Sequence, residues 1–600
     1  MKKMEAFVGG FLYWVLLSLI LKVGFMLYNL SVYSSVGGIE WLSVLWHGLP
    51  LDCSLAGYLS IIPGLSLMVG VWMGNGGEVF RRFYYWLASW IVVILSMLNA
   101  VLYGYWRFPL DTTPFFYFFS SPSDALASAG WREYTVLAVL LALLVLSAWM
   151  TMRRGRRCKP ADATPHRMST TLGLCVLMAL LFIPIRGGLT VSTMNTGEVY
   201  YSENEALNHA AVNPVFSLME SVSKQEDFGR QYRLMDDAQA SSIFQAMTAT
   251  GSDSTQNILS QSRPDVYIII MESFSRLVME TGATPCLNRL ADEGVFFENF
   301  YANSFRTDRG LVAVLSGFPG QPTMSIMKYP AKTRYLPSIA RSLRKAGYSA
   351  VYYYGGDADF CNQRSYLVSQ GYQRIVDDKE FPLRYRLSKW GVPDGPVFGR
   401  VEEDVEKGSD KSPALRVIQT SSSHEPFDVP ARLNANKRLN AFAYADQQIG
   451  QFVSYLRRSG RWQRSLVVLV ADHLGAWPEN IDNGRLDRFQ IPLIITGGAV
   501  RSPLKSAVYG SQQDIAATLL GQLGIRHDDF LFSKDLLNPA IPHFAFFTYP
   551  DAFGMADADN QLIYDLKAKR ILIDQGHRRG KNFLSGKAYL QKLYDVISQL

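Results

Sequence analysis

Residues 266–273, VYIIIMES, place a glutamate directly after an almost unbroken run of apolar, mostly β-branched residues. A second segment, SLVVLVADH at 465–473, repeats this arrangement and ends in an aspartate and a histidine. Such short apolar runs are typical of strands buried on both faces of a sheet. In open α/β sheets, ligands bind at the carboxyl ends of the strands. The two segments therefore predict both a fold and the place of its site.

Similar runs recur from residue 264 onward and alternate with stretches of helical periodicity, such as 336–346 and 436–458. Near-continuous apolar strands separated by helices predict a mainly parallel central sheet that is covered on both faces. The later segment 562–574, LIYDLKAKRILID, is typical of a hairpin. The strands expected before it are 266–271, 350–354, 415–419, 465–470, 491–496 and 544–548.

The composition indicates an apolar part joined to an ordinary globular part. Of the 600 residues, 48% are hydrophobic and only 18% are charged, whereas soluble domains carry about 25% charged residues. The net charge of +7 is too small over this length to argue for a nucleic-acid partner. Five cysteines exclude a disulfide-dense scaffold.

The apolar residues are concentrated near the start of the chain. A transmembrane helix needs about 20 apolar residues. The first charge-free run reaches that length only if it continues past Lys22, whose aliphatic stem can extend towards an interface. The sequence predicts five spans, and the alternative is fewer spans with one run as a buried core helix. The runs without Asp, Glu, Lys or Arg are 6–21, 53–77, 83–106, 134–152 and 168–185.

The basic residues near these runs predict the orientation. They lie at the N-terminus, in the loop 78–82 and in the loop 153–167, which carries six Lys and Arg residues. With five spans these segments share one side of the membrane, and the positive-inside rule makes that side cytoplasmic. The chain is therefore expected to be a multi-pass protein of the cytoplasmic (inner) membrane, with everything after about residue 187 outside the cytoplasm.

The predicted organisation has three parts. Residues 1–186 form a five-span transmembrane domain, 187–260 a juxtamembrane helical connector and 261–600 an extracytoplasmic α/β domain. Within the connector, short amphipathic helices are expected around 214–224 and 234–249. The connector could equally be part of the edge of the larger domain.

Four places carry residues that suit chemistry on an anionic substrate. Glu272, Asp472 and His473 at two strand ends could hold a divalent cation. Thr307 precedes an apolar helical stretch, and a helix N-terminus attracts phosphate while a metal or base could activate the hydroxyl. His424 lies beyond a further strand and could contact a phosphoryl oxygen or protonate a leaving group. Taken singly, each has a plainer interpretation as a strand-end loop residue, a helix cap or a structural histidine.

Taken together, these segments resemble the lipoteichoic acid synthase-type phosphoglycerol transferases of the alkaline phosphatase/sulfatase superfamily. The similar segments, in chain order, are IIIMESFS, SFRTDRG, SSSHEPF and VADHLG, and SQQDIAATLLGQLGI is similar to a late helix of that superfamily. The resemblance covers nearly the whole chain. It implies five spans followed by an extracytoplasmic sulfatase-like domain with a mainly parallel sheet.

The resemblance implies a role for each matched residue. Glu272, Thr307, Asp472 and His473 would bind one divalent cation, Mn²⁺ by preference, with Mg²⁺ and Zn²⁺ as alternatives. Thr307 would also be the nucleophile. His424 would contact the phosphoryl group.

A head-group-binding stretch of the family corresponds here to YYYGGDADFCNQRSYL at 352–367. Tyr354 and Cys361 stand at about the places where the Gram-positive synthases have a His and a Trp. This departure favours a Gram-negative envelope, and it affects the head group and acceptor more than the reaction. The residues implied in substrate binding are Arg306, Asp357, Asn362 and Arg364.

The implied function is transfer of a phosphoglycerol-type head group from a phospholipid, such as phosphatidylglycerol, to an envelope acceptor through a phosphothreonine. The acceptor stays open. A phosphoethanolamine transferase is an alternative, although Cys286 and Cys361 allow only one disulfide in the outer part of the chain. Three further functions stay open: a sulfatase, a phosphodiesterase that uses water, and a catalytically silent membrane scaffold.

Overall fold

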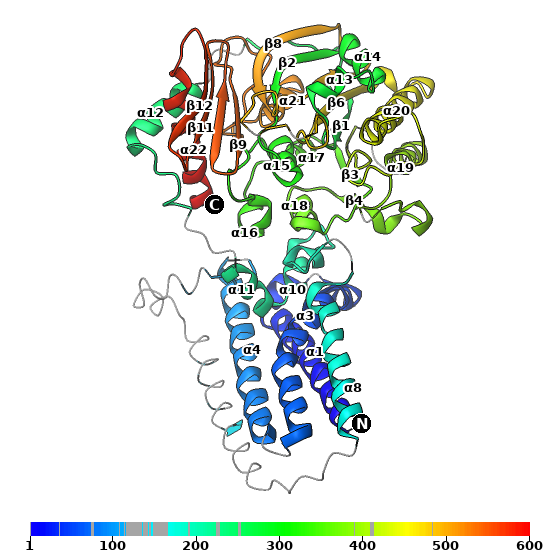
Figure 1. Ribbon diagram of the computed structural model, residues 1–600, viewed down its shortest axis with the longest axis vertical. Helices are drawn as coiled ribbons and strands as arrows, with labels where there is room; N and C mark the ends of the chain where they lie inside the picture. Colours follow the sequence, from blue (N-terminus) through cyan, green and yellow to red (C-terminus); the bar gives the residue numbers. More distant parts are fainter. Residues whose placement is uncertain are drawn as a thin grey trace. The chain divides into compact units, whose positions relative to one another are not determined.

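The computed structural model describes two compact units, Met1–Glu226 and Asp227–Leu600 (Figure 1). The boundary between them falls inside the segment 187–260, which contributes helices to both. The structure describes most of residues 2–112 and 166–600, and only isolated positions between 113 and 165. Further short gaps fall at 35, 74–76, 107, 190–191, 224–227, 250–253, 389, 409–412, 480 and 483.

Four helical segments among the described residues are long and apolar enough to cross a membrane. They are α1 (Lys2–Tyr28), α3 (Gly38–Met73), α4 (Glu78–Trp106) and the pair α8 (Arg167–Leu180) and α9 (Phe182–Arg186). They coincide with four of the five predicted runs. The fifth run, 134–152, and the basic loop 153–167 lie almost entirely outside the described residues. The shorter helices of this unit are α2 (Leu30–Tyr33), η2 (Thr196–Val199), α10 (Glu205–Ala211) and α11 (Pro214–Ser223).

Helix α3 begins at Gly38, well before the predicted run that starts at residue 53, and it carries Asp52 in a buried ion pair. Asp52 lies inside the helix and accepts a hydrogen bond from Lys22 Nζ of α1 at 2.8 Å, and the side chain of Asn213 donates to its other oxygen at 2.9 Å. A paired carboxylate does not interrupt an apolar helix as an isolated one would. The expectation that Lys22 extends to an interface is therefore wrong, because its ammonium is buried against Asp52.

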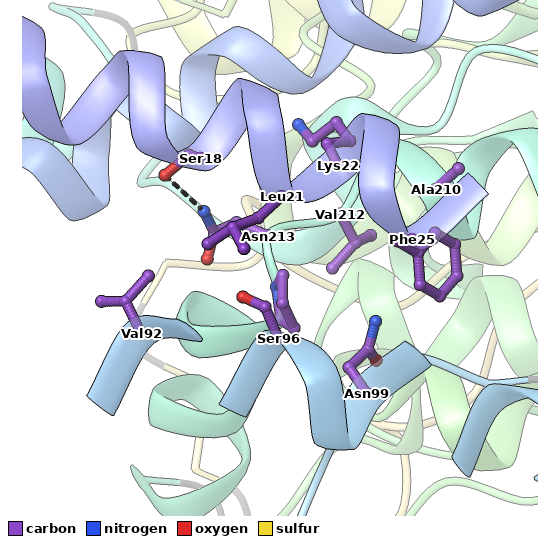
Figure 2. A pocket seen from close by; sticks show the side chains of 11 residues that line it. Ser18, Leu21, Lys22, Phe25, Val92, Ser96, Asn99, Ala210, Val212 and Asn213 are labelled. Carbon is purple, nitrogen blue, oxygen red and sulfur yellow. Dashed lines mark hydrogen bonds between the residues drawn. The ribbon is translucent and has the colours of Figure 1, made fainter. Parts of the chain in front are cut away.

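Figure 2 shows the hollow beside this pair, between α1, α4 and the segment 210–214. Ser18, Ser96 and Asn99 are among its polar lining residues. Lys22 also donates to the carbonyl oxygen of Ala211 at 2.9 Å. The segment between α10 and α11 is thereby fixed to α1 by polar contacts rather than by apolar packing alone.

The strands described in the second unit form an eight-stranded sheet and a four-stranded sheet (Figure 1). The larger has the order β4-β3-β5-β1-β6-β7-β2-β8, and its neighbours are parallel except that β7 runs antiparallel to both β6 and β2. Its strands are β1 (Asp265–Met271), β2 (Val295–Tyr301), β3 (Ser349–Tyr354), β4 (Arg374–Val376), β5 (Ala414–Gln419), β6 (Ser465–Ala471), β7 (Leu493–Thr496) and β8 (Leu504–Ser511).

The centre of this sheet is covered on both faces. Every residue of β1, β5 and β6 is buried, and successive side chains of a strand point to opposite faces. One set of contacting helices contains α14 (Pro285–Glu293), α19 (Asp394–Lys407) and α20 (Lys437–Arg458), and another contains α15 (Thr307–Ser316), α17 (Ile339–Lys345) and α21 (Asp514–Gln522). The remaining α-helices are α12 (Asp237–Met247), α13 (Arg276–Met279), α16 (Pro330–Thr333), α18 (Gln363–Ser369) and α22 (Lys581–Gln599).

The smaller sheet is antiparallel, with the order β12-β11-β10-β9. Its strands are β9 (Ala545–Tyr549), β10 (Ala552–Ala556), β11 (Asn560–Asp565) and β12 (Arg570–Gly576). The predicted hairpin at 562–574 is confirmed as β11 and β12. The expectation that 544–548 belongs to the main sheet is wrong. A two-residue turn with Asp551 at φ 59° folds β10 back onto β9, so this strand pairs with its neighbour in sequence instead.

Candidate active site

Glu272, Asp472 and His473 meet because β1 and β6 are adjacent, parallel and in register. Met271 pairs with Ala471 at the ends of these strands, so the next residues leave the sheet side by side. One ligand atom from each of the three side chains lies within 4.8 Å of the others. His473 Nε2 is 3.8 Å from Glu272 Oε1 and 3.5 Å from Asp472 Oδ2. The structure thus brings together the three residues that the sequence placed at strand ends.

Thr307 is the first residue of α15 and faces this cluster. Its Oγ1 donates to Glu272 Oε2 at 3.4 Å and lies 3.3 Å from His473 Nε2. The helix approaches β6 so closely that a Cβ on Gly310 would lie 2.3 Å from the backbone oxygen of Asp472. A glycine in the first turn of α15 therefore lets the threonine hydroxyl reach the strand ends.

The donor set fits a divalent cation. Asp472 Oδ1 accepts from the backbone N–H groups of Ser273 and His473, both at 2.8 Å. Its Oδ2 is buried and has no hydrogen-bond partner among the described residues, and buried polar atoms are normally satisfied. Burial and the charge of Asp472 raise the pKa of Glu272 well above its ordinary value. A cation would satisfy Asp472 Oδ2 and compensate both carboxylates.

His424 lies in the loop after β5. Its Nδ1 donates to the carbonyl oxygen of Glu425 at 2.9 Å, and its ring packs on Trp390 with the ring centroids 4.1 Å apart. Burial lowers the pKa of His424, and the neighbouring His473 lowers it further. The charges of His473 and Asp472 therefore act on His424. This agrees with the sequence, which places His424 at the same edge of the sheet as these residues.

The four residues implied in head-group binding lie in different surroundings. Arg306 is exposed and directly precedes Thr307. Asp357 Oδ1 accepts from the backbone of Asp359 at 3.0 Å. Asn362 donates to the carbonyl of Lys328 at 3.2 Å, and within the described chain its Oδ1 is buried without a partner.

Arg364 is already ion-paired inside the protein. Its Nε lies 2.5 Å from Asp359 Oδ1, and its Nη2 contacts Asp377. Burial works against its charge, but these two carboxylates raise the pKa of Arg364. The role of Arg364 in head-group binding stays a prediction. In the structure its guanidinium joins Asp359, in the loop after β3, to Asp377.

Three residues near the site escape inspection of the sequence. Trp390 packs on His424, and Asp394 accepts from the backbone N–H groups of Ser421 and Ser422. Gln512 donates to the carbonyl oxygens of Ala471 and Asp472, both at 2.7 Å. These partners are distant in sequence. The sequence feature that could have pointed to Gln512 is its place in the segment SQQDIAATLLGQLGI. For Asp394 that feature is its place at the start of a helix.

The family model described as Sulfatase matches residues 264–525. This range contains the cluster, Thr307, His424 and both strands that carry the metal-ligand candidates. These residues form a sulfatase-like domain. The predicted resemblance and the predicted fold are thereby confirmed: apolar N-terminal helices precede a sulfatase-like domain with a mainly parallel sheet.

Two relatives are similar to a little under half of this chain. Lipoteichoic acid synthase 2 of Bacillus subtilis (strain 168) is 25% identical over 313 residues, which are 46% of this chain and 47% of that protein. Phosphoglycerol transferase I of Xanthomonas campestris pv. campestris (strain B100) is 27% identical over 315 residues, or 47% of this chain and 44% of that protein. The chain spans a little under half the length of these two relatives.

A solved structure has the same fold. It is a protein of the alkaline phosphatase superfamily from Vibrio parahaemolyticus, with a TM-score of 0.53 and 24% identity, and the alignment covers 61% of this chain and 97% of that one. The sulfatase and alkaline phosphatase superfamily is metal-dependent, which agrees with the cluster around Thr307. Cys286 and Cys361 are not joined in a disulfide, so the one bridge that the sequence allowed is not formed.

Proposed function

We propose that the protein is a membrane-anchored, metal-dependent transferase that moves a phosphoglycerol-type head group from a phospholipid to an acceptor of the cell envelope. The observation that carries this proposal is the convergence of Glu272, Asp472 and His473 on the hydroxyl of Thr307. A hydroxyl held at a helix N-terminus inside such a cluster suits nucleophilic attack on an anionic phosphorus. The names of the relatives supply the substrate class.

Glu272, Thr307, Asp472 and His473 would hold one divalent cation. Their mixed oxygen and nitrogen donors suit Mn²⁺, and Mg²⁺ or Zn²⁺ are the alternatives. When bound, the cation would lower the pKa of the threonine hydroxyl and place a positive charge beside the phosphodiester.

In the first step, Thr307 Oγ1 attacks phosphorus and forms a phosphothreonine. The bond from phosphorus to the diacylglycerol oxygen breaks. The Thr307 hydroxyl gives up its proton and the diacylglycerol oxygen takes up one proton, so diacylglycerol leaves as a neutral alcohol. The backbone N–H groups at the start of α15 attract the phosphoryl oxygens. The side chain of Thr307 is suited to this role because its hydroxyl points to Glu272 and His473.

In the second step, the bond from phosphorus to Thr307 breaks, Thr307 Oγ1 takes up one proton, and phosphorus is attacked by an acceptor hydroxyl. His424 accepts the proton of that hydroxyl on Nε2, because its Nδ1 already donates to a backbone carbonyl. Arg306 and Asn362 are proposed to contact the head group, the first through its exposed guanidinium and the second through its Oδ1, which has no partner among the described residues. Asp357 and Arg364 would complete that surface.

The apolar helices give this chemistry a physical rationale. A phospholipid leaves the bilayer only at a large cost in free energy, so an enzyme that consumes its head group benefits from being fixed at the membrane surface. We propose five spans, with the sulfatase domain on the extracytoplasmic side of the inner membrane and in the periplasm of a Gram-negative cell. The four described apolar helices and the basic segments near them support this arrangement.

The test uses the full chain in detergent with labelled phosphatidylglycerol and Mn²⁺, and it measures diacylglycerol release. We expect release by the wild type, a loss of about 1,000-fold or more in Thr307→Ala, and partial activity in Thr307→Ser, which keeps the hydroxyl. Equal release by wild type and Thr307→Ala would contradict the proposal.

The same assay separates the competing functions. Faster release from phosphatidylethanolamine than from phosphatidylglycerol would indicate a phosphoethanolamine transferase. Free glycerol phosphate as the product in the presence of envelope extract would indicate a hydrolase. Two observations favour the phosphoglycerol transferase. Cys286 and Cys361 form no disulfide with each other, unlike the cysteines of a disulfide-rich phosphoethanolamine transferase, and the segment SFRTDR lacks the proline of a formylglycine sulfatase.

A further inference from the structure

The loop 420–424, which carries His424, is anchored at one side to the strand that carries Glu272. The backbone N–H of Glu272 donates to Thr420 Oγ1 at 2.9 Å, and Ser423 Oγ donates to the carbonyl oxygen of Glu272 at 2.6 Å. These bonds fix the two ends of the loop to the end of β1. The residues between them are held by a different element.

The middle of the loop is held by Asp394. The Oδ1 of this carboxylate accepts from the backbone N–H groups of Ser421 at 2.7 Å and Ser422 at 3.2 Å. The backbone N–H of Asp394 donates in return to Ser422 Oγ at 2.9 Å, and Ser421 Oγ donates to the carbonyl oxygen of Val392 at 3.1 Å. The start of α19 and the loop are therefore joined reciprocally.

Asp394 does not have the usual role of an acidic residue at a helix start. Such residues normally accept from N–H groups of their own helix, whereas Asp394 Oδ1 accepts from the loop. The carboxylate is almost completely buried, and its Oδ2 has no hydrogen-bond partner in the described part of the chain. Burying a carboxylate at this place costs free energy that the loop contacts offset.

The segment before Asp394 fixes the ring of His424. Trp390 packs on this ring with centroids 4.1 Å apart and receives the edge of Phe360 at 5.6 Å. Gly391 has φ 104°, and a Cβ there would lie 2.1 Å from the backbone oxygen of Gly355. The segment 390–394 is thus pressed against the loop after β3 and has little freedom to move.

We propose that Asp394 is a positioning residue for His424, acting through the backbone of Ser421 and Ser422. This inference rests on the proposed function, in which His424 takes the proton of the acceptor hydroxyl in the second step. The hydrogen bonds of Asp394 go to the loop, and neither the cation cluster nor Thr307 is among its partners within the described chain. Its removal should therefore disturb the second step and leave the first step intact.

The test compares single and double variants of the full chain in detergent, with labelled phosphatidylglycerol and Mn²⁺. We expect Asp394→Ala to keep the initial stoichiometric burst of diacylglycerol and to lower the following steady-state rate by about 10- to 100-fold. In the His424→Ala background, Asp394→Ala should cause no further loss, because the residue through which it acts is gone. Asp394→Asn keeps the shape of the side chain and one of its two oxygens. If Asp394→Ala does not fold, Asp394→Asn replaces it in the wild-type and His424→Ala backgrounds.

Asp446 offers a matched control. It is a buried carboxylate of α20 that accepts from the backbone N–H groups of Cys286 and Leu287 at 2.9 and 2.7 Å, so these hydrogen bonds go to α14 and not to the loop 420–424. We expect Asp446→Asn to lower the thermal unfolding temperature but to leave the ratio of burst to steady-state rate unchanged.

Two results would overturn the inference. One is an equal loss from the Asp394 substitution in the wild-type and His424→Ala backgrounds. The other is a burst that falls together with the steady-state rate, as in a general loss of folded protein. Failure of the proposed function itself is distinguishable, because Thr307→Ala would then release diacylglycerol at the wild-type rate.

Discussion

At the scale of single residues, the protonation state of His424 decides whether its ring can accept the proton of the acceptor hydroxyl in the second step. The bond from Nδ1 to the carbonyl of Glu425 leaves Nε2 as the proton acceptor of the neutral ring. Burial lowers the pKa of His424 below its ordinary 6.5, so the ring is neutral at pH 7. We expect the breakdown of phosphothreonine to be independent of pH above 6.5 and to slow as the pH falls through the lowered pKa.

This pH dependence is measured by following the decay of preformed phosphothreonine on the full chain. His424→Gln should remove the acidic limb together with most of the rate, because glutamine cannot accept a proton in this range. An acidic limb of the same shape in His424→Gln would assign the titration to another group and contradict this account of His424.

The residues that could be predicted from the sequence share one property: each follows or begins a local apolar segment. Glu272, Asp472 and His473 end buried strands, and Thr307 opens a helix. Asp394 could not be predicted, because its partners lie 27 and 28 residues further along the chain and its own surroundings are those of an ordinary helix start. The sequence shows that Arg364 is charged, but it does not predict that Asp359 and Asp377 pair with that charge.

At the scale of elements, the position of α15 depends on the close approach of its first turn to β6. We expect Gly310→Ala to displace the helix, because the new Cβ would lie 2.3 Å from the backbone oxygen of Asp472. A misplacement of about 1 Å at a reacting group costs about 100-fold in rate, and the overpacking costs about 1–3 kcal/mol of stability. Diacylglycerol release and thermal unfolding measure the two effects.

Gly399 is the control for this substitution. It lies within α19, and a Cβ there would meet no described atom within 4 Å beyond its chain neighbours and the nearby backbone of its own helix. We expect Gly399→Ala to leave the rate unchanged and to stabilise the helix by about 0.5–1 kcal/mol. Wild-type activity in Gly310→Ala would show that the hydroxyl of Thr307 does not depend on this contact.

The pair of Lys22 and Asp52 connects two of the apolar helices. Asp52→Asn leaves the buried ammonium of Lys22 without its counter-charge, and breaking a buried pair in this way costs about 3–5 kcal/mol. We expect a clear fall in the unfolding temperature of the full chain in detergent. Replacing both partners, as in Lys22→Met with Asp52→Leu, should restore most of that stability.

The partly exposed pair of Arg82 and Glu78 provides the comparison, since it also joins charged side chains of the membrane unit. Glu78→Gln should change stability by less than about 1 kcal/mol. An Asp52→Asn protein as stable as Glu78→Gln would mean that the buried pair does not hold α1 and α3 together.

At the scale of the whole molecule, the sequence predicted the division into apolar helices and an α/β domain better than it predicted the limits of the sheets. Strands with continuous apolar runs, such as β1 and β6, were found because every residue in them is buried. Strand β8 lies at a sheet edge and begins by alternating between partly buried and exposed residues, and β2 is interrupted by Glu298 and Asn299, so the sequence predicts neither strand. The position of β9 depends on a tight turn and not on its composition.

The central claim is that Glu272, Thr307, Asp472 and His473 form one cation site around an activatable hydroxyl. Titration of Mn²⁺ into the metal-free full chain, followed by electron paramagnetic resonance of the unbound ion, tests it most directly. We expect one tight site per chain that is weakened by about 100-fold or more in Asp472→Asn and unchanged in Asp446→Asn. A protein that binds no Mn²⁺ tightly, or binds it equally well after Asp472→Asn, would contradict the claim.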